Sequence, residues 1–202
     1  MLTDDIYVRT RTDDEIAGLA LSMRTVLGVP NEAPAPDVLL SLENELPRYI
    51  EQFALLPVAD GSLGRGRPAR ASFRPPKIEI ENSSYVRLSL GQAQARFDAA
   101  HELGHLILHN DGPATLAKNR TAGNIVYVAR SDMSGEKQAD QFSAEFLAPQ
   151  HIVRLCGSWE EVAEWCLIPP TWAKDVFRRY GENRRVVLPT SLQDKFRKLN
   201  ED

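Results

Sequence analysis

The sequence predicts an α+β fold in which several helices accompany a small sheet. Apolar residues recur at helical spacing in 12–27, 90–109 and 134–148, a spacing that gives each helix one buried face. Residues 77–82 and 125–129 are instead typical of short strands, the first because apolar and polar residues alternate in it. Together these segments predict a largely helical core with a small sheet.

The composition narrows the class of protein. A chain of 202 residues, 43% hydrophobic and 26% charged, can form one domain with an apolar core, with or without a small appendage. Its net charge of -4 argues against a dedicated nucleic-acid binder, which carries a basic excess. No signal-peptide pattern opens the sequence, and no stretch approaches the roughly 18 apolar residues that span a bilayer. We therefore expect a cytoplasmic protein. Cys156 and Cys166 could pair if the fold brought them together, but in such a protein we expect reduced, partly buried thiols.

The first 58 residues predict two helices and one ambiguous segment. Thr12 and Glu15 have the Ser/Thr-x-x-Glu spacing of a capping box, so a helix should begin there and end at Gly28. A second helix is expected over 37–46, ending before a proline. Residues 49–58 fit a strand or a helix.

Residues 60–77 are predicted to form a loop, because glycine and proline are frequent in them. The part from 64 to 77 is basic. It carries Arg65, Arg67, Arg70, Arg74 and Lys77. Two interpretations stay open: a solvated surface loop, or a lip that recognises an acidic substrate or a nucleic acid.

The middle of the chain continues with strands and a long helix. Residues 77–82 and 84–90 both alternate apolar and polar residues, so both are predicted as strands. Ser89 and Gln92 then have capping-box spacing and predict a helix over 90–109.

The second half of the chain predicts a strand over 125–129 and then three helices. The first is expected over 134–148, and two shorter ones over 159–166 and 171–180. The last two have helix-turn-helix proportions, but the first of them is acidic and the second begins "PTWAKD". Because a DNA-reading pair carries basic or amide side chains there, we expect packing against the core or partner docking instead. The apolar seam of this pair consists of Trp159, Val162, Trp165, Trp172, Val176 and Phe177.

Three of the four histidines lie within residues 101–109. His101, Glu102 and His105 form H-E-x-x-H on the predicted helix. Residues four apart on a helix lie on one face about 6 Å apart along the axis, so both imidazoles can reach one metal ion. Glu102 can then reach a water held by that ion and act as general base. His109 lies about 12 Å from His101 along the axis, too far to bind the same ion, and is interpreted as a packing or outer group.

A third ligand is expected on the helix over 134–148. Glu136 and Asp140 form E-x-x-x-D on one face, with the small Ala139 between them allowing close approach of another helix. Glu136 would complete a two-histidine, one-carboxylate set, which is typical of catalytic zinc. Asp140 would accept the outer ring N–H of a ligand histidine. Residue types alone do not distinguish zinc from manganese or another divalent ion.

The two motifs resemble those of the ImmA/IrrE family of bacterial zinc metallopeptidases. "RFDAAHELGHLILH" and "EKQADQFSAEFLAP" carry the resemblance, which is strongest over 77–181. Ser143 and Ala148 stand where the family usually has alanine and methionine. The E-x-x-x-D feature is also similar to that of gluzincin metallopeptidases.

The resemblance implies a zincin-like metallopeptidase core, with N-terminal helices and a C-terminal helical extension. We expect the domain over 1–150 and the extension over 151–202, packed with the core or separate from it. The implied activity is zinc-dependent hydrolysis of a peptide bond in a helix-turn-helix repressor, encoded nearby, during stress response or mobile-element control. Tyr127, Tyr85 and His151 are candidates for stabilising the oxyanion, with a structural role as the alternative for each. The alternative is a toxin–antitoxin-type binding protein whose metal site is vestigial or structural, although an intact Glu102 favours the enzyme.

Overall fold

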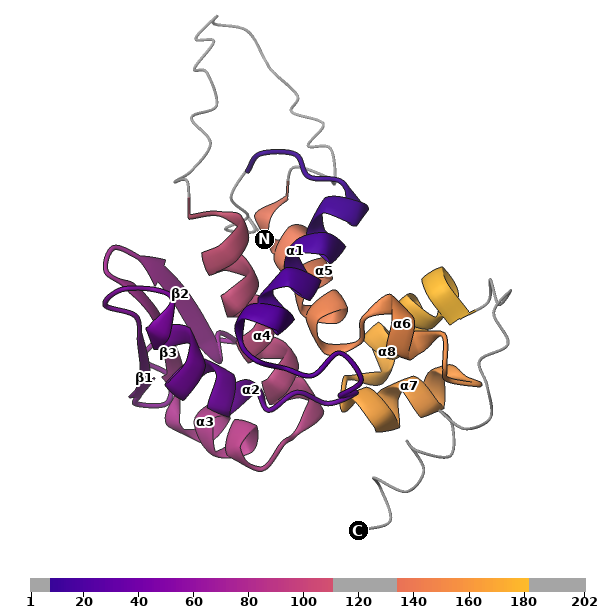
Figure 1. Ribbon diagram of the computed structural model, residues 1–202. Helices are drawn as coiled ribbons and strands as arrows, with labels where there is room; N and C mark the ends of the chain where they lie inside the picture. The colour runs from indigo at the N-terminus through magenta and orange to yellow at the C-terminus, as the bar shows by residue number, and fades with distance from the viewer. Residues whose placement is uncertain (1–7, 111–133, 182–202) are drawn as a thin grey trace, which may run out of the picture.

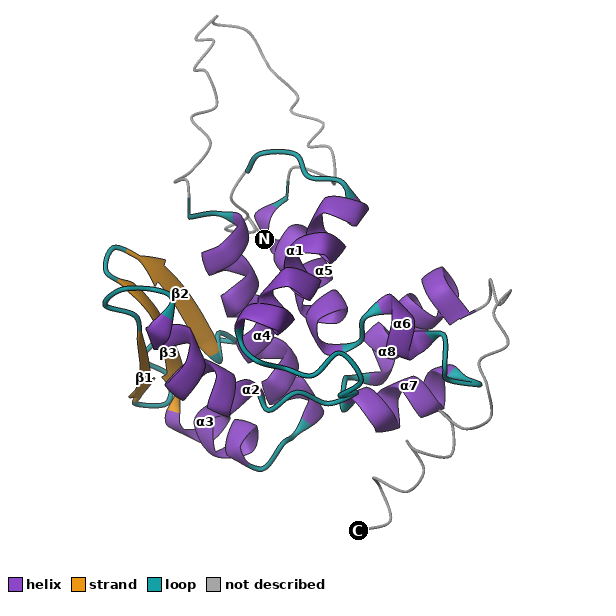
Figure 2. Ribbon diagram, in the orientation of Figure 1, coloured by secondary structure: helices purple, strands orange, loops and turns teal. Residues whose placement is uncertain are grey.

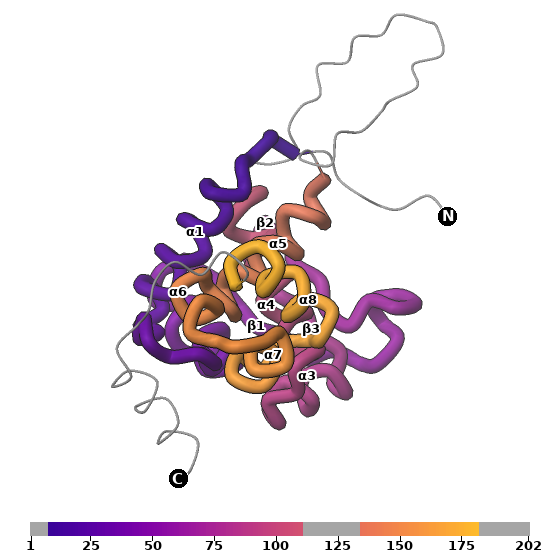
Figure 3. Tube along the Cα trace, turned by 90° about the vertical axis from the view of Figure 1, so that its right-hand side faces the viewer, coloured from indigo at the N-terminus to yellow at the C-terminus, as the bar shows by residue number. Residues whose placement is uncertain are grey.

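A computed structural model describes residues 8–110 and 134–181, and it confirms the α+β class. Helices α1 (Asp13–Val26), α4 (Ala93–Leu108) and α5 (Gly135–Leu147) pack together at the centre. The sheet lies on one side of α4, and α6 to α8 lie on the other side (Figures 1 and 2). Figure 3 views the molecule from the side of α6 to α8. The other elements are α2 (Val38–Leu40), a π-helical turn (Ser41–Glu45), a 3-10 turn (Leu46–Arg48), β1 (Ala54–Val58), β2 (Ala69–Phe73), β3 (Pro76–Glu81), α3 (Asn82–Ser89), α6 (Gln150–Val153), α7 (Trp159–Cys166), α8 (Pro170–Val176) and a π-helical turn (Phe177–Gly181).

The sheet has the strand order β1-β3-β2, with β1 parallel and β2 antiparallel to β3. Ile78 and Ile80 on β3 are buried, as their alternation predicts. The Glu81 N–H donates to the Pro68 carbonyl at 2.9 Å, so Pro68 and Glu81 form a hydrogen-bonded pair. Hydrogen-bonded and non-hydrogen-bonded pairs alternate along the antiparallel β2–β3 ladder from that point. In this register Ala71 is a non-hydrogen-bonded partner of Ile78, so its N–H points away from β3. Strand β2 packs against α4, and its outer edge therefore faces the helix that carries H-E-x-x-H.

Helix α1 begins with the predicted capping box. The Thr12 N–H donates to Glu15 Oε2 at 2.7 Å, and the Glu15 N–H donates to Thr12 Oγ1 at 3.2 Å. Two backbone donors that the helix itself cannot satisfy are paired in this way. The chain leaves α1 through Gly28, whose φ of 66° favours glycine.

Helices α4 and α5 cross at two small residues. A Cβ on Gly104 would lie 3.1 Å from Phe142 Cδ1 and 3.2 Å from the Ala139 Cα and carbonyl oxygen. The backbones can approach closely only because Gly104 has no side chain and Ala139 has a small one. Ser143, one of the two departures from the family pattern, donates its hydroxyl to the Phe97 carbonyl at 2.9 Å and so adds a further α4–α5 contact.

The C-terminal helices pack on the core. The Trp172 ring stacks on Phe97 of α4, with ring centroids 4.7 Å apart. The buried Glu145 of α5 accepts hydrogen bonds from the Tyr180 hydroxyl at 2.6 Å and Arg179 Nη1 at 2.9 Å. The apolar seam of α7 and α8 therefore contacts the core, which was one of the two expected uses. The boundary at residue 150 stays a prediction.

The prediction of a strand over 84–90 is wrong, because these residues fall in α3 and its end. Ser84 and Leu88, four apart, are the buried positions of this segment, whereas Leu90 is 69% exposed. The buried positions thus follow helical spacing and not alternation. The predicted capping box at Ser89 and Gln92 is also wrong, since Ser89 ends α3 and Gly91, with a φ of 70°, separates α3 from α4.

Two boundary predictions are corrected in the same way. The basic segment 64–77 is not one loop, because β2 and the start of β3 lie in it, and Arg70 and Lys77 pair with Glu79 of β3 at 2.8 Å and 3.1 Å. The helical segment expected over 37–46 continues to Arg48, because a proline is tolerated near the start of the short 3-10 turn.

Three remaining predictions are placed as follows. The ambiguous segment 49–58 contains strand β1, and the expected strand over 125–129 lies outside the described residues. Cys156 and Cys166 are both buried thiols without a disulfide between them, and burial raises the pKa of Cys166. No helix in the described parts of the chain is long and apolar enough to cross a membrane.

Candidate metal centre

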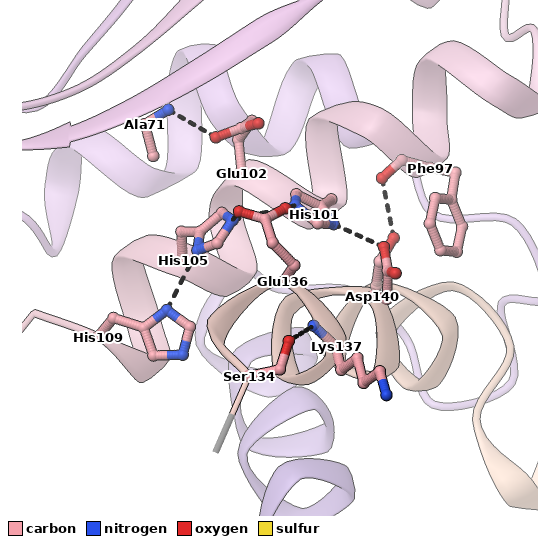
Figure 4. Close-up of polar contacts among 11 residues, drawn as sticks. Ala71, Phe97, His101, Glu102, His105, His109, Ser134, Glu136, Lys137 and Asp140 are labelled. Atoms are coloured by element: carbon pink, nitrogen blue, oxygen red, sulfur yellow. Dashed lines mark hydrogen bonds and ion pairs between the residues drawn. The ribbon is translucent and has the colours of Figure 1, made fainter. Parts of the chain in front are cut away.

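Helix α4 presents the three residues of H-E-x-x-H toward α5 and the sheet. His101 and His105, one turn apart, turn their rings toward each other, and their Nε2 atoms are 3.0 Å apart (Figure 4). Two imidazole nitrogens at this distance can serve the same ion, as the spacing along the helix predicts.

Helix α5 brings Glu136 to the same point. Ser134 caps this helix, with its Oγ accepting from the Lys137 N–H at 3.1 Å, so Glu136 lies in the first turn. Its Oε2 is 3.2 Å from His101 Nε2, and its Oε1 is 3.5 Å from His105 Nε2. One ligand atom from each of the three residues lies within 4.8 Å of the other two.

The three side chains fit a divalent cation. A tetrahedral zinc ion with ligands at about 2.0–2.1 Å needs ligand atoms roughly 3.3 Å apart. The separation of the two imidazole nitrogens is 3.0 Å, and each nitrogen has one Glu136 oxygen close to that distance, Oε2 at 3.2 Å from His101 and Oε1 at 3.5 Å from His105. The donor set is two imidazoles and one carboxylate, which leaves a fourth position for water or substrate and is typical of catalytic zinc.

The outer nitrogens of the two histidines have different partners. His101 Nδ1 is 2.8 Å from Asp140 Oδ1, the arrangement that E-x-x-x-D predicts. His105 Nδ1 is 3.1 Å from His109 Nδ1, so His109 lies beside a candidate ligand and not among the three. Figure 4 shows both contacts as dashed lines, from His101 to Asp140 and from His105 to His109.

Glu102 lies between the metal centre and the sheet. Its Oε2 accepts a hydrogen bond from the Ala71 N–H of β2 at 2.6 Å (Figure 4). The edge of β2 thus holds the carboxylate beside the two histidines.

The pKa values of three side chains in the centre are shifted from their usual values. Burial lowers the pKa of His101, but hydrogen bonds to Asp140 and Glu136 raise it more, to about 10. The hydrogen bond with His101 is the main cause that holds the pKa of Glu136 well below its usual range, and the neighbouring His105 acts in the same direction. Burial raises the pKa of Glu102, although His101, His105 and the Ala71 N–H act in the opposite direction. A raised carboxylate pKa suits a general base, because it brings proton affinity closer to neutral pH.

Two of the three candidates for oxyanion stabilisation have partners outside the metal centre. The Tyr85 hydroxyl donates to Glu43 Oε1 at 2.5 Å, and His151 Nε2 lies 2.6 Å from the Asn31 carbonyl oxygen. Both groups are therefore engaged with residues outside the metal centre. Tyr127 lies outside the described residues.

The sequence patterns did not identify two residues of the site, Ala71 and Gln138. Ala71 acts through its backbone N–H, for which a side chain gives no signal. Gln138 is 2% exposed, its Oε1 lies 3.3 Å from His109 Nε2, and its Nε2 donates to the Arg9 carbonyl at 2.8 Å. Only the tertiary packing of α4, α5 and the segment before α1 brings His109, Gln138 and Arg9 together.

Comparison with known proteins agrees with this geometry. Residues 85–158 match the family model described as Peptidase_M78, IrrE N-terminal-like domain. The matched stretch runs from α3 to the cap of α7 and contains every residue of the candidate metal centre except Ala71. Comparison with curated proteins gave no match, and neither did comparison with solved structures. As the resemblance of its two motifs predicted, residues 85–158 of the chain match the IrrE N-terminal-like family of M78 peptidases.

Proposed function

We propose that this chain is a zinc-dependent peptidase in which His101, His105 and Glu136 hold the metal and Glu102 is the general base. The observation that carries the proposal is the convergence of two α4 imidazoles and one α5 carboxylate within 4.8 Å. The match to a peptidase family over the same residues supports it. A structural zinc site would have no need of Glu102, because such sites have four protein ligands and no water to activate.

The roles of the residues follow from their positions. A zinc ion bound there would polarise the scissile carbonyl and lower the pKa of the attacking water. Glu102 takes the proton of that water and delivers it to the leaving nitrogen. Because the Ala71 N–H already occupies one lone pair of Oε2, we assign the proton to Oε1. Asp140 accepts the Nδ1–H of His101 and keeps the Nε2 lone pair of that ring directed at the metal.

The substrate we propose is a helix-turn-helix transcriptional regulator encoded beside the gene, cleaved in the cytoplasm during stress response or mobile-element control. The support is the resemblance of the two motifs to those of ImmA/IrrE proteins. The acidic α7 also favours a protein partner over DNA, since Glu160, Glu161 and Glu164 would repel phosphates.

The experiment incubates the full chain with the co-encoded regulator and follows cleavage by mass spectrometry. Glu102→Gln keeps an oxygen for the Ala71 N–H but cannot take up a proton, so we expect cleavage to slow by about 10²–10⁴-fold. Zinc content should stay that of the wild type, and a chelator should abolish wild-type cleavage. Glu51→Gln, an exposed glutamate before β1, is the matched control and should cleave normally.

Two results would count against the proposal. Cleavage by Glu102→Gln at the wild-type rate would remove Glu102 from the reaction. A cellular effect of the protein that survives Glu102→Gln would favour a regulatory binding protein with a structural metal site.

A further inference from the structure

The outer contact of His105 joins two ring nitrogens. His105 Nδ1 and His109 Nδ1 are 3.1 Å apart. One of the two must carry a hydrogen and the other a lone pair, because a nitrogen–nitrogen hydrogen bond needs one donor and one acceptor. The direction of this hydrogen bond decides which nitrogen of His105 is left to bind a metal.

Gln138 determines the direction. Its Nε2 donates to the Arg9 carbonyl at 2.8 Å, and a carbonyl oxygen can only accept. The amide is therefore oriented with Oε1 toward His109 Nε2, 3.3 Å away. Because Oε1 is also only an acceptor, His109 Nε2 must carry the hydrogen.

The remaining hydrogen bond, between His109 and His105, follows from this assignment. We call the series of hydrogen bonds from the Arg9 carbonyl through Gln138 and His109 to His105 the relay. A neutral His109 with its hydrogen on Nε2 has a lone pair on Nδ1, so the His105 Nδ1–H donates to it. His105 then has its own lone pair on Nε2, the atom that faces His101 Nε2 at 3.0 Å and Glu136 Oε1 at 3.5 Å. His109 is 8% exposed and Gln138 is 2% exposed, so solvent competes little for either hydrogen bond.

We propose that Gln138 and His109 are positioning residues that fix the tautomer of His105 through an uncharged relay beginning at the Arg9 carbonyl. The inference rests on the proposed function, because it gives His105 Nε2 the role of metal ligand. The relay fixes the tautomer of His105, as Asp140 fixes the tautomer of His101. Unlike Asp140, it adds no charge to a centre that already contains Glu102, Glu136 and Asp140. It also makes the segment before α1 part of the support of the metal centre.

Imidazole nitrogen NMR of the full chain tests the relay directly. With only four histidines, the ¹⁵N and ring ¹H resonances can be assigned by substitution. In the metal-free wild type we expect His109 to carry its hydrogen on Nε2 and His105 on Nδ1. A His109 that carries its hydrogen on Nδ1 alone, and so donates to His105, would overturn the proposal without any variant having to fold.

Zinc affinity supplies the second measurement. Gln138→Met has a similar shape but no acceptor, so the tautomer of His109 is released and we expect the zinc Kd to rise about 10–100-fold. Gln138→Glu keeps an acceptor oxygen for the His109 Nε2–H, so its Kd should stay closer to that of the wild type. Thermal melting checks that both variants are folded.

The outcomes separate the relay from the function on which it rests. A wild type that binds no zinc would defeat the proposed function, while the tautomers of the metal-free protein would still decide the relay. A wild type that binds zinc, with Gln138→Met binding equally well and with unchanged ring resonances, would overturn the relay and leave the peptidase proposal standing.

Discussion

The two candidate ligand histidines lie one turn apart on α4, but their outer nitrogens meet different surroundings. His101 Nδ1 contacts a carboxylate, Asp140, at 2.8 Å, whereas His105 Nδ1 contacts a neutral ring, His109, at 3.1 Å. A carboxylate fixes the tautomer and also adds negative charge, which raises the basicity of the ring. A neutral relay fixes the tautomer alone. The comparison indicates that His101 receives orientation and charge from one partner, whereas His105 receives orientation alone.

Removing Glu136 should have the largest effect, because its carboxylate faces both histidines. We expect Glu136→Ala to raise the zinc Kd by more than about 100-fold, the upper limit of what loss of an outer partner costs. Equilibrium dialysis with metal analysis measures this, and Glu164→Ala on the exposed face of α7 is the control. Zinc bound by Glu136→Ala with the wild-type Kd would mean that the third ligand lies elsewhere.

Substitutions of Asp140 separate charge from orientation on the His101 side. Asp140→Ala removes both the acceptor and the charge, and we expect the zinc Kd to rise by about 100-fold. Asp140→Asn can keep an acceptor oxygen for His101 Nδ1, so we expect a rise of only about 10-fold. Equal losses in the two variants would contradict this separation and would make charge the whole contribution of Asp140.

The pH dependence of zinc binding should also come from the His101 side. In the metal-free protein the pKa of His101 is raised to about 10, so at neutral pH the metal must displace a proton from that ring. Affinity should therefore rise with pH, by about tenfold per pH unit between roughly pH 7 and 9, with about one proton released. Calorimetry in buffers of different ionisation enthalpy counts the proton. Affinity that does not change over this range would contradict a protonated His101.

A smaller effect is expected where α4 and α5 cross. Gly104→Ala places a methyl group 3.2 Å from the Ala139 backbone, an overpacking cost of about 1–3 kcal/mol that the better helix propensity of alanine offsets by about 1 kcal/mol. Gly18→Ala on α1 meets nothing within 4 Å and should gain about 0.5–1 kcal/mol. Urea unfolding compares the two variants. If Gly104→Ala stabilises as much as Gly18→Ala, the helices are not held at this crossing.

The sequence predicts the centre well where helical geometry relates the residues. His101, Glu102 and His105 lie on one helix, and Glu136 and Asp140 on another, so spacing alone places each set on one face. The contacts of Ala71 and Gln138 could not be predicted, because they cross 31 and 29 positions of sequence and depend on how β2 and α5 pack on α4. The prediction of a strand over 84–90 was wrong for a different reason. Seven residues that alternate between apolar and polar also contain positions four apart, and the burial of Ser84 and Leu88 favours the helix.

Diffraction from crystals grown with zinc, with data collected on both sides of the zinc absorption edge, tests the central claim most directly. We expect one anomalous peak about 2.0–2.2 Å from His101 Nε2, His105 Nε2 and a carboxylate oxygen of Glu136. A peak held by other residues, or Glu136 turned away from an ion on the two histidines, would contradict the account.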